Sequence, residues 1–270
     1  MSPASLWAVA SPVGLSLAFW PVWRWYVLRL ADGSDERWGL LALATALVLA
    51  WHAHAPSPPR QDALHIVAVP VAVYAVTFPL LPPLAHAILA VVAVGLFVSQ
   101  AYLPRPVQAP ICGLLLLALP VEATAQFVIG YPLRVLVARG SASLLALGGL
   151  AVEPRGSGLS WAGETVLVDA PCSGVRMLWA GLFLALVLAC LHGLGAGRTA
   201  ALVTAALALT LAANTGRAAV LFLAEAQVVR APAWAHEAVG VLAFILAALA
   251  VAWLASRLRR EGPCVAPASS

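Results

Sequence analysis

Apolar stretches of about 20 residues follow one another along nearly the whole chain, with little polar sequence between them. A helix needs roughly 20 mostly apolar residues to cross a bilayer. Only 10% of the 270 residues are charged, against about 25% in an ordinary soluble domain. We therefore predict an all-α, polytopic membrane protein whose helices form one bundle, a single integral membrane domain over residues 1–270.

Breaks at proline, glycine and charged residues predict about eight transmembrane helices. The predicted helices are Leu6–Trp23, Gly39–Ala53, Ala63–Leu80, Leu84–Tyr102, Ala109–Ile129, Cys172–Leu191, Thr199–Ala224 and His236–Ala255. The only long interruption separates the fifth helix from the sixth. Its first half, Tyr131–Leu150, mixes arginines with leucines and fits an interfacial helix. Its second half is a short polar segment on the outer face, which becomes extended at Thr165–Val168.

All fifteen basic residues are arginine, which excludes every mechanism that needs a lysine. The arginines are scattered, so the formal charge of +4 gives no support for nucleic-acid binding. Only Arg257, Arg259 and Arg260 cluster, directly after the last apolar stretch, where they predict a cytoplasmic anchor in contact with membrane lipids. The first apolar stretch has no basic region before it and no cleavage site after it, so we expect it to be retained. An even number of helices then places both termini in the cytoplasm.

Four cysteines are present, and their spacing is not that of a metal site. Cys112 and Cys190 lie in apolar stretches, and Cys264 lies in the C-terminal tail, whereas Cys172 has polar neighbours. His52 and His54 have no third ligand nearby in the sequence. We expect neither a metal nor another cofactor.

Polar and ionisable residues gather near the ends of the last three predicted helices. Cys172 and Arg176 open the sixth helix, Asn214 and Arg217 lie near the end of the seventh, and His236 opens the eighth. Successive helices run in opposite directions, so these residues reach the same membrane surface, the outer one on the orientation above. Ionisable groups at such depths are costly and are usually functional.

The segment 169–174, Asp-Ala-Pro-Cys-Ser-Gly, suits a reactive thiol. Asp169 can cap the helix, and the helix dipole favours a thiolate at Cys172 in the first turn. Arg176 lies on the same face and adds positive charge. His236 could take the thiol proton and later protonate a leaving amine, and Arg217 could pair with the thiolate or stabilise an oxyanion.

Each of these residues also has an ordinary structural interpretation. Cys172 could be a small apolar residue that only fills space in the core. Arg217 could have only a structural role, with its aliphatic stem in the membrane and its guanidinium at the interface. His236 could be an interfacial histidine without a catalytic role. Small residues at helical spacing predict close helix packing in the same region. These are Ala208, Ala212 and Gly216 on the seventh helix and Gly240 and Ala247 on the eighth.

Three motifs in this order resemble the exosortase/archaeosortase family of membrane-embedded transpeptidases. They are Ala-Pro-Cys-Ser-Gly-Val-Arg (170–176), Asn-Thr-Gly-Arg (214–217) and His-Glu-Ala-Val-Gly (236–240). The resemblance covers residues 109–257, which it marks as the catalytic half. The predicted helices within residues 1–108 are less characteristic.

The resemblance implies a nucleophile at Cys172, a general acid/base at His236 and a positioning or stabilising role for Arg217. Arg176, Asn214, Ser173 and Asp169 would support them. The implied substrates are exported proteins whose C-terminal tail has a short motif such as Pro-Glu-Pro, one transmembrane helix and a basic cluster. Cleavage would occur at the periplasmic or outer face of the bacterial inner membrane, in systems linked to exopolysaccharide, with transfer to an unknown acceptor.

Several alternatives remain open from the sequence. The thioester could be hydrolysed rather than transferred, which would make the protein a protease. A small-solute transporter would use intramembrane Arg and Asn to line a pathway. A scaffold of an exopolysaccharide assembly system would need no thiol chemistry. An intramembrane metalloprotease is excluded, because position 240 is glycine where that motif needs a second histidine.

Overall fold

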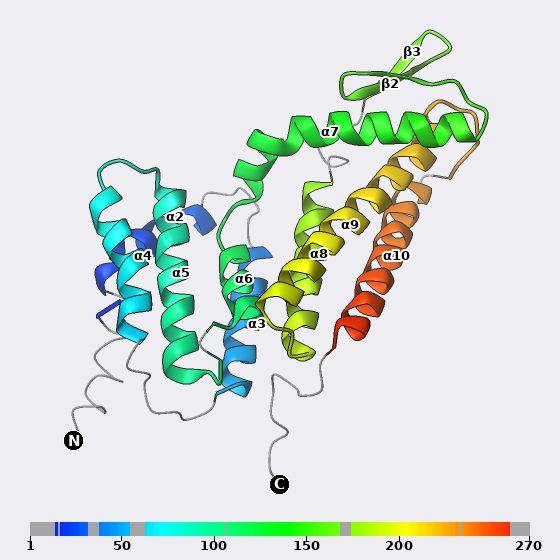
Figure 1. Cartoon of the computed structure of the whole chain (residues 1–270). Helices are drawn as coiled ribbons and strands as arrows, with labels where there is room; N and C mark the ends of the chain where they lie inside the picture. Colours follow the sequence, from blue (N-terminus) through cyan, green and yellow to red (C-terminus); the bar gives the residue numbers. More distant parts are fainter. Residues whose placement is uncertain are drawn as a thin grey trace, which may run out of the picture. The chain divides into compact units, whose positions relative to one another are not determined.

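The structure, a computed structural model, describes residues 14–15, 17–31, 38–54, 63–105, 107–167, 174–232 and 234–259, without the side chains of 63–65. The predictions made for 6–13 and for Asp169, Cys172 and Ser173 lie outside these residues. Nine helices and one three-stranded sheet occur in the described part (Figure 1). The described chain is therefore mostly helical, as predicted.

Four of the described helices are long and apolar enough to cross a membrane. They are α5 (Pro83–Tyr102), α7 (Glu122–Leu147), α9 (Ala196–Glu225) and α10 (Ala235–Leu258). The shorter helices are α2 (Trp20–Ala31), α3 (Trp38–His52), α4 (Ala63–Thr77), α6 (Ala109–Leu117) and α8 (Val175–Leu191). The helical membrane architecture is confirmed by these lengths and compositions, and the number of eight spans stays a prediction.

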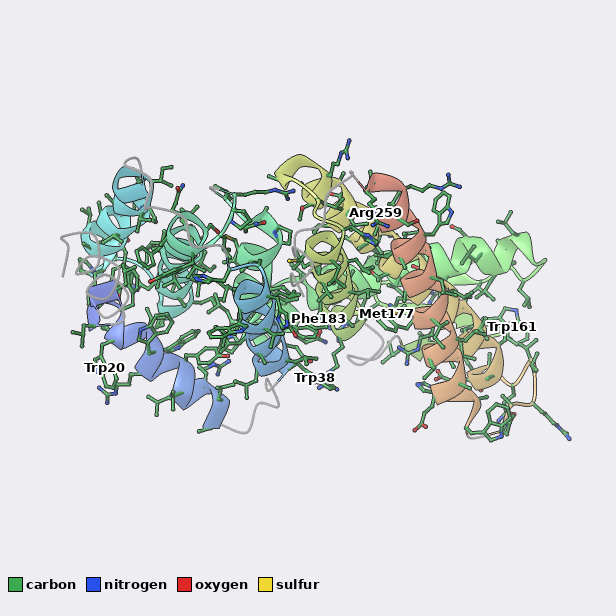
Figure 2. All side chains as sticks on the ribbon, turned by 90° about the horizontal axis from the view of Figure 1, so that it is seen from below. Trp20, Trp38, Trp161, Met177, Phe183 and Arg259 are labelled. Atoms are coloured by element: carbon green, nitrogen blue, oxygen red, sulfur yellow. The ribbon has the colours of Figure 1, made fainter. Side chains whose placement is uncertain are left out.

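Apolar side chains cover the outside of the helices rather than only their contacts. Figure 2 shows side chains projecting all along the helices, including Trp20 and Trp38, and both of these tryptophans are exposed. On α10 the large apolar side chains that are exposed are Val241, Leu242, Ile245, Leu246, Leu249 and Trp253. Exposed apolar surface of this extent is suited to lipid and not to water.

The chain divides into two compact units, and each unit is built from two or three separate segments of the sequence. The first unit consists of residues 1–121, 186–199 and 259–270. The second consists of residues 122–185 and 200–258. The motifs described above all fall in the second unit.

The first unit is held together by aromatic packing and by close helix contacts. Phe19 and Tyr74 meet edge to face with their ring centroids 4.9 Å apart. Its later piece, 186–199, packs against the earlier ones. A Cβ on Gly113 of α6 would lie 2.5 Å from Leu186 Cδ2, and the Arg105 guanidinium donates to the Leu194 carbonyl at 3.3 Å.

The predicted fifth transmembrane helix, Ala109–Ile129, is wrong as a single helix. Helix α6 ends at Leu117, and α7 begins at Glu122. Pro120 lies between them and has no amide proton to continue the helical hydrogen bonds. Helix α7 then runs to Leu147 through Pro132 and contains most of the predicted interfacial helix.

The predicted first helix, Leu6–Trp23, has its end placed too early. Its first part lies outside the described residues, and the described helix α2 begins at Trp20 and continues past the predicted end at Trp23 to Ala31. Helix α2 carries Arg24 and Arg29, and an arginine breaks an apolar run without breaking a helix. A boundary drawn from hydropathy therefore ends too soon.

A small antiparallel sheet follows α7, in strand order β1-β2-β3. Strands β1 (Glu153–Arg155), β2 (Gly158–Trp161) and β3 (Glu164–Leu167) pair consecutively. The β2–β3 turn has positive φ at both central residues, Ala162 (53°) and Gly163 (88°), as the tightest hairpins require. Only β3 was anticipated, as the extended stretch Thr165–Val168, because strands of three or four residues carry too little alternation to be recognised.

Helix α7 runs crosswise to α9 and α10 in Figure 1 and packs on α9. The Ser141 hydroxyl donates to the Thr215 carbonyl at 2.9 Å and fixes the crossing point. The apolar contact there joins Val137, Ala138, Ala142 and Leu145 of α7 to Leu159 of β2 and to Ala218, Ala219 and Phe222 of α9. A helix that lies across two spanning helices follows the membrane surface, which favours the predicted interfacial role for α7.

Tryptophans mark both ends of α10. Trp234 lies just before its first residue and Trp253 near its last turn, and both are exposed. At 1.5 Å per residue the two indoles are about 28 Å apart along the helix, close to the hydrocarbon thickness of a bilayer. The Arg257 guanidinium lies 5.2 Å from the Trp253 ring centroid. Helix α10 therefore fits one crossing, with His236 close to one membrane surface.

Candidate functional site

The first motif meets the second at Gly174, which lies just before α8. Its φ is +84°, and a Cβ placed on it would lie only 2.8 Å from Asn214 Nδ2. Asn214 is 1% exposed and therefore has little room to move away. Both the backbone conformation and the contact demand glycine, two residues after the predicted nucleophile.

The second motif meets the third at Gly240, one turn after His236. A Cβ on Gly240 would lie 3.2 Å from Arg217 Nε and 3.5 Å from Arg217 Cζ. The guanidinium therefore lies against the backbone of α10. Arg217 Nε is buried and has no hydrogen-bond partner among the described residues. A buried donor without a partner is uncommon and is often found at functional sites.

Arg176 has a neighbour that the sequence did not predict. Its Nε lies 2.6 Å from Glu122 Oε1, in an ion pair that joins the start of α8 to the start of α7. The predicted place of Arg176 beside the Cys172 sulfur stays a prediction, because Cys172 lies outside the described residues. A signal was available, because Glu122 is an ionisable residue inside a predicted transmembrane helix.

The ion pair should contribute little to stability, because the Arg176 side chain is 66% exposed. We expect Glu122→Gln and Arg176→Gln each to lower the free energy of unfolding by about 0.2–1 kcal/mol. The double variant should lose no more than the larger single loss, since both changes remove the same contact. Denaturant titration in detergent micelles measures this. Fully additive losses would contradict the pairing.

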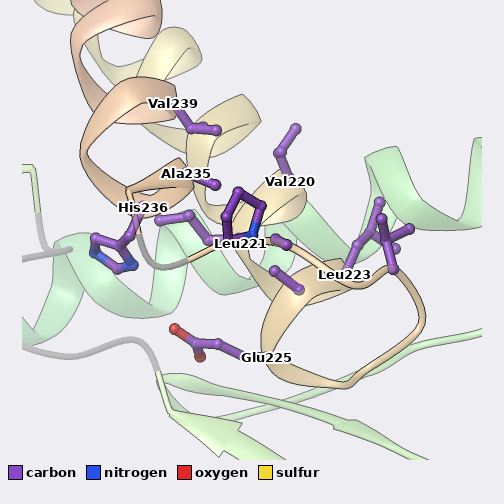
Figure 3. Close-up of a pocket in the computed structure, with 11 residues that line it drawn as sticks. Val220, Leu221, Leu223, Glu225, Ala235, His236 and Val239 are labelled. Atoms are coloured by element: carbon purple, nitrogen blue, oxygen red, sulfur yellow. The ribbon is translucent and has the colours of Figure 1, made fainter.

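His236 lies at the rim of a cavity of about 290 Å³ formed by the end of α9, the loop after it and the start of α10 (Figure 3). We call this the α9–α10 cavity. Glu225, the last residue of α9, lies on the same side, and its carboxylate points toward the His236 side of the cavity in Figure 3. Glu225 was not among the predicted site residues, because it follows the predicted end of the seventh helix.

The predicted small-residue packing is partly wrong. Ala208 and Ala212 are exposed, and a Cβ on Gly216 would meet no atom within 4 Å. The close approaches on α9 lie on another face, at Thr210 against Gly181 and at Asn214 against Gly174. At these approaches, glycines on the partners of α9 accept larger side chains from α9.

The second unit thus brings together the described members of all three motifs. Asn214 packs at Gly174, Arg217 packs at Gly240, and His236 begins the helix that carries Gly240. The roles assigned to these side chains stay predictions. Within the described residues, no three His, Cys, Asp or Glu side chains are grouped closely enough to hold a metal ion.

The fold and the site together define a polytopic membrane protein with a polar cluster at one end of three consecutive helices. A sequence model of the transmembrane exosortase family matches residues 7–253. The chain belongs to this family. The match begins well before residue 109, so the N-terminal helices are also part of the family pattern. Searches of curated proteins and of solved structures give no match.

Proposed function

We propose that this exosortase-family protein is a cysteine protease or transpeptidase that removes the C-terminal sorting tail of exported proteins through a thioester on Cys172. The site would act at the outer face of the bacterial inner membrane. The observation that carries the proposal is the packing of Gly174 on Asn214 and of Arg217 on Gly240, which gathers three separate motifs in one unit.

The chemistry needs three groups, and the motifs supply them. His236 takes the proton of the Cys172 thiol, and the thiolate attacks the scissile carbonyl carbon. Arg217 stabilises the negative charge that develops on the carbonyl oxygen. His236 then gives its proton to the departing amine as the carbon–nitrogen bond breaks. The acyl group remains on sulfur as a thioester until an amine or water attacks it.

The two arginines have different roles in this proposal. Arg176 is already paired with Glu122, so part of its charge is balanced. Arg217 has a buried Nε with no described partner. We therefore assign anion stabilisation to Arg217 and an anchoring role at the start of α8 to Arg176.

The test compares the native host carrying the wild-type protein with strains carrying Cys172→Ala or Cys190→Ala. Cys190 is buried in α8 and serves as the matched control. The readout is the set of C-terminal tryptic peptides of membrane proteins. We expect a group of exported proteins to keep an apolar tail that ends in arginines only in the Cys172→Ala strain. If no tails accumulate while the variant protein is present at normal levels, the proposal fails.

The same samples distinguish transfer from hydrolysis. Mass spectrometry of the new C-terminus of processed proteins would show a free carboxylate after hydrolysis and an added mass after transfer. A free carboxylate on every product would make the protein a protease and would exclude the transpeptidase form of the proposal.

A further inference from the structure

The α9–α10 cavity is mostly apolar and opens beside the predicted acid/base. Its volume of about 290 Å³ is near the lower limit for small-ligand sites, so it suits one or two side chains. Apart from Glu225 and His236, the residues that line the cavity have aliphatic side chains or are proline. They are Val220, Leu221, Leu223, Ala224, Val229, Ala231, Pro232, Ala235 and Val239.

We propose that the α9–α10 cavity binds the residue that follows the scissile bond, the first residue of the departing tail, and selects an apolar side chain there. This inference rests on the proposed function. When the thiolate forms its bond to the carbonyl carbon, the carbon–nitrogen bond breaks and the nitrogen takes its proton from His236. That nitrogen must therefore lie within hydrogen-bond reach of His236. The residue that carries it then lies beside His236, where the structure has a cavity.

The charge at the rim fits the product of this step. Once released, the new amino terminus of the tail takes up a further proton from water and becomes an ammonium ion. Glu225 offers a carboxylate at the rim, which favours a cation there and disfavours an acidic residue at the same position. An amine that later attacks the thioester must lose its proton to His236 and so would approach through the same place.

Photocrosslinking in the native host tests the proposal directly. Val239 lines the cavity, whereas Val241, on the opposite face of α10, is 59% exposed and does not. Val239→p-benzoylphenylalanine and Val241→p-benzoylphenylalanine are each introduced into full-length Cys172→Ala protein, which keeps its substrates intact. The probes are the tail-bearing proteins that accumulate in that strain.

We expect the benzophenone at position 239 to crosslink to the first few residues after the cleavage point, and the one at 241 to give no such product. Crosslinks from position 239 to the segment before the cleavage point would overturn the assignment. The absence of crosslinks at 239 while tail-bearing proteins accumulate, together with equal rates for the two phenylalanine variants below, would also overturn it. If Cys172→Ala accumulates no tails at all, the proposed function itself has failed, and the inference fails with it.

A second pair of variants keeps the catalytic groups unchanged. Val239→Phe narrows the cavity, and Val241→Phe adds the same ring on the opposite face. We expect Val239→Phe to slow tail removal by about tenfold or more, measured by pulse-chase labelling, since apolar pockets discriminate by that amount. Val241→Phe should remain within twofold of wild type. Equal rates for the two variants, at equal protein levels, would refute a role for the cavity.

Discussion

Replacing Arg217 by alanine should slow tail removal by about 10²–10³-fold, the loss typical of removing one anion-stabilising donor. Arg217→Lys should be nearly as slow. The guanidinium lies flat against the α10 backbone at Gly240, with its Nε buried. A lysine ammonium has no planar fork, is more strongly hydrated and could not replace this contact. Pulse-chase labelling of a substrate identified in the Cys172→Ala strain measures both rates.

Arg139→Lys is the matched control for this experiment. Arg139 is exposed on α7 and belongs to none of the three motifs, and its replacement should leave the rate within twofold of wild type. The levels of all variants are compared by immunoblot, so that a folding defect is recognised. Wild-type activity in Arg217→Lys would show that a point charge suffices and that the planar, forked guanidinium is not required.

Gly174→Ala should nearly abolish tail removal and should also destabilise the protein. A non-glycine residue at a φ of +84° costs about 1–3 kcal/mol of backbone strain. The new methyl group would in addition lie 2.8 Å from the buried Asn214 amide, so the chain leading back to Cys172 would have to shift. A shift of about 1 Å in a reacting group can cost about 10²-fold in rate. Unfolding in detergent and pulse-chase labelling measure the two effects separately.

Gly216→Ala, on the neighbouring helix α9, should have the opposite effect on stability. A Cβ there meets no atom within 4 Å, so alanine should raise the free energy of unfolding by about 0.5–1 kcal/mol. In the double variant Gly174→Ala/Asn214→Ala, the steric part of the loss should be relieved while the backbone strain remains. If Gly174→Ala cleaves tails at the wild-type rate, the contact with Asn214 is not needed to position the thiol.

The sequence predicted the helical membrane class because apolar length and low charge depend only on composition. The predicted helix boundaries were wrong at Pro120, where a single proline separates two helices. Ala109–Ile129 is continuous in hydropathy, yet α6 ends at Leu117 and α7 begins at Glu122, with Pro120 between them. Hydropathy also cannot distinguish a helix that crosses the bilayer from one that lies along it, since α7 has enough apolar residues for either.

The sequence predicted only those candidate site residues that belong to local motifs. The antiparallel order of three helices was enough to predict that Asn214, Arg217 and His236 lie near one membrane surface. The structure places Asn214 at Gly174 and Arg217 at Gly240, and their joint role in a site stays a prediction. Glu122 and Glu225 were not predicted, because each lies at the end of a helix whose boundary was misplaced. Their positions depend on tertiary packing, which joins the start of α7 to the start of α8 and folds the chain back after α9. The spacing of residues along the chain does not show which helix ends pack together.

The interleaving of the two units has a consequence for biosynthesis. Residues 186–199 belong to the first unit, where Leu186 packs at Gly113 and Leu194 accepts a hydrogen bond from Arg105. These contacts are unavailable until the nascent chain has been synthesised through the α8–α9 turn. Because that turn comes after the Cys172 segment, these contacts of the first unit cannot form until residues 122–185 of the second unit have been synthesised. A ribosome that stalls before residue 199 therefore leaves both units unfinished, and a quality-control protease would encounter one incomplete molecule rather than a folded half.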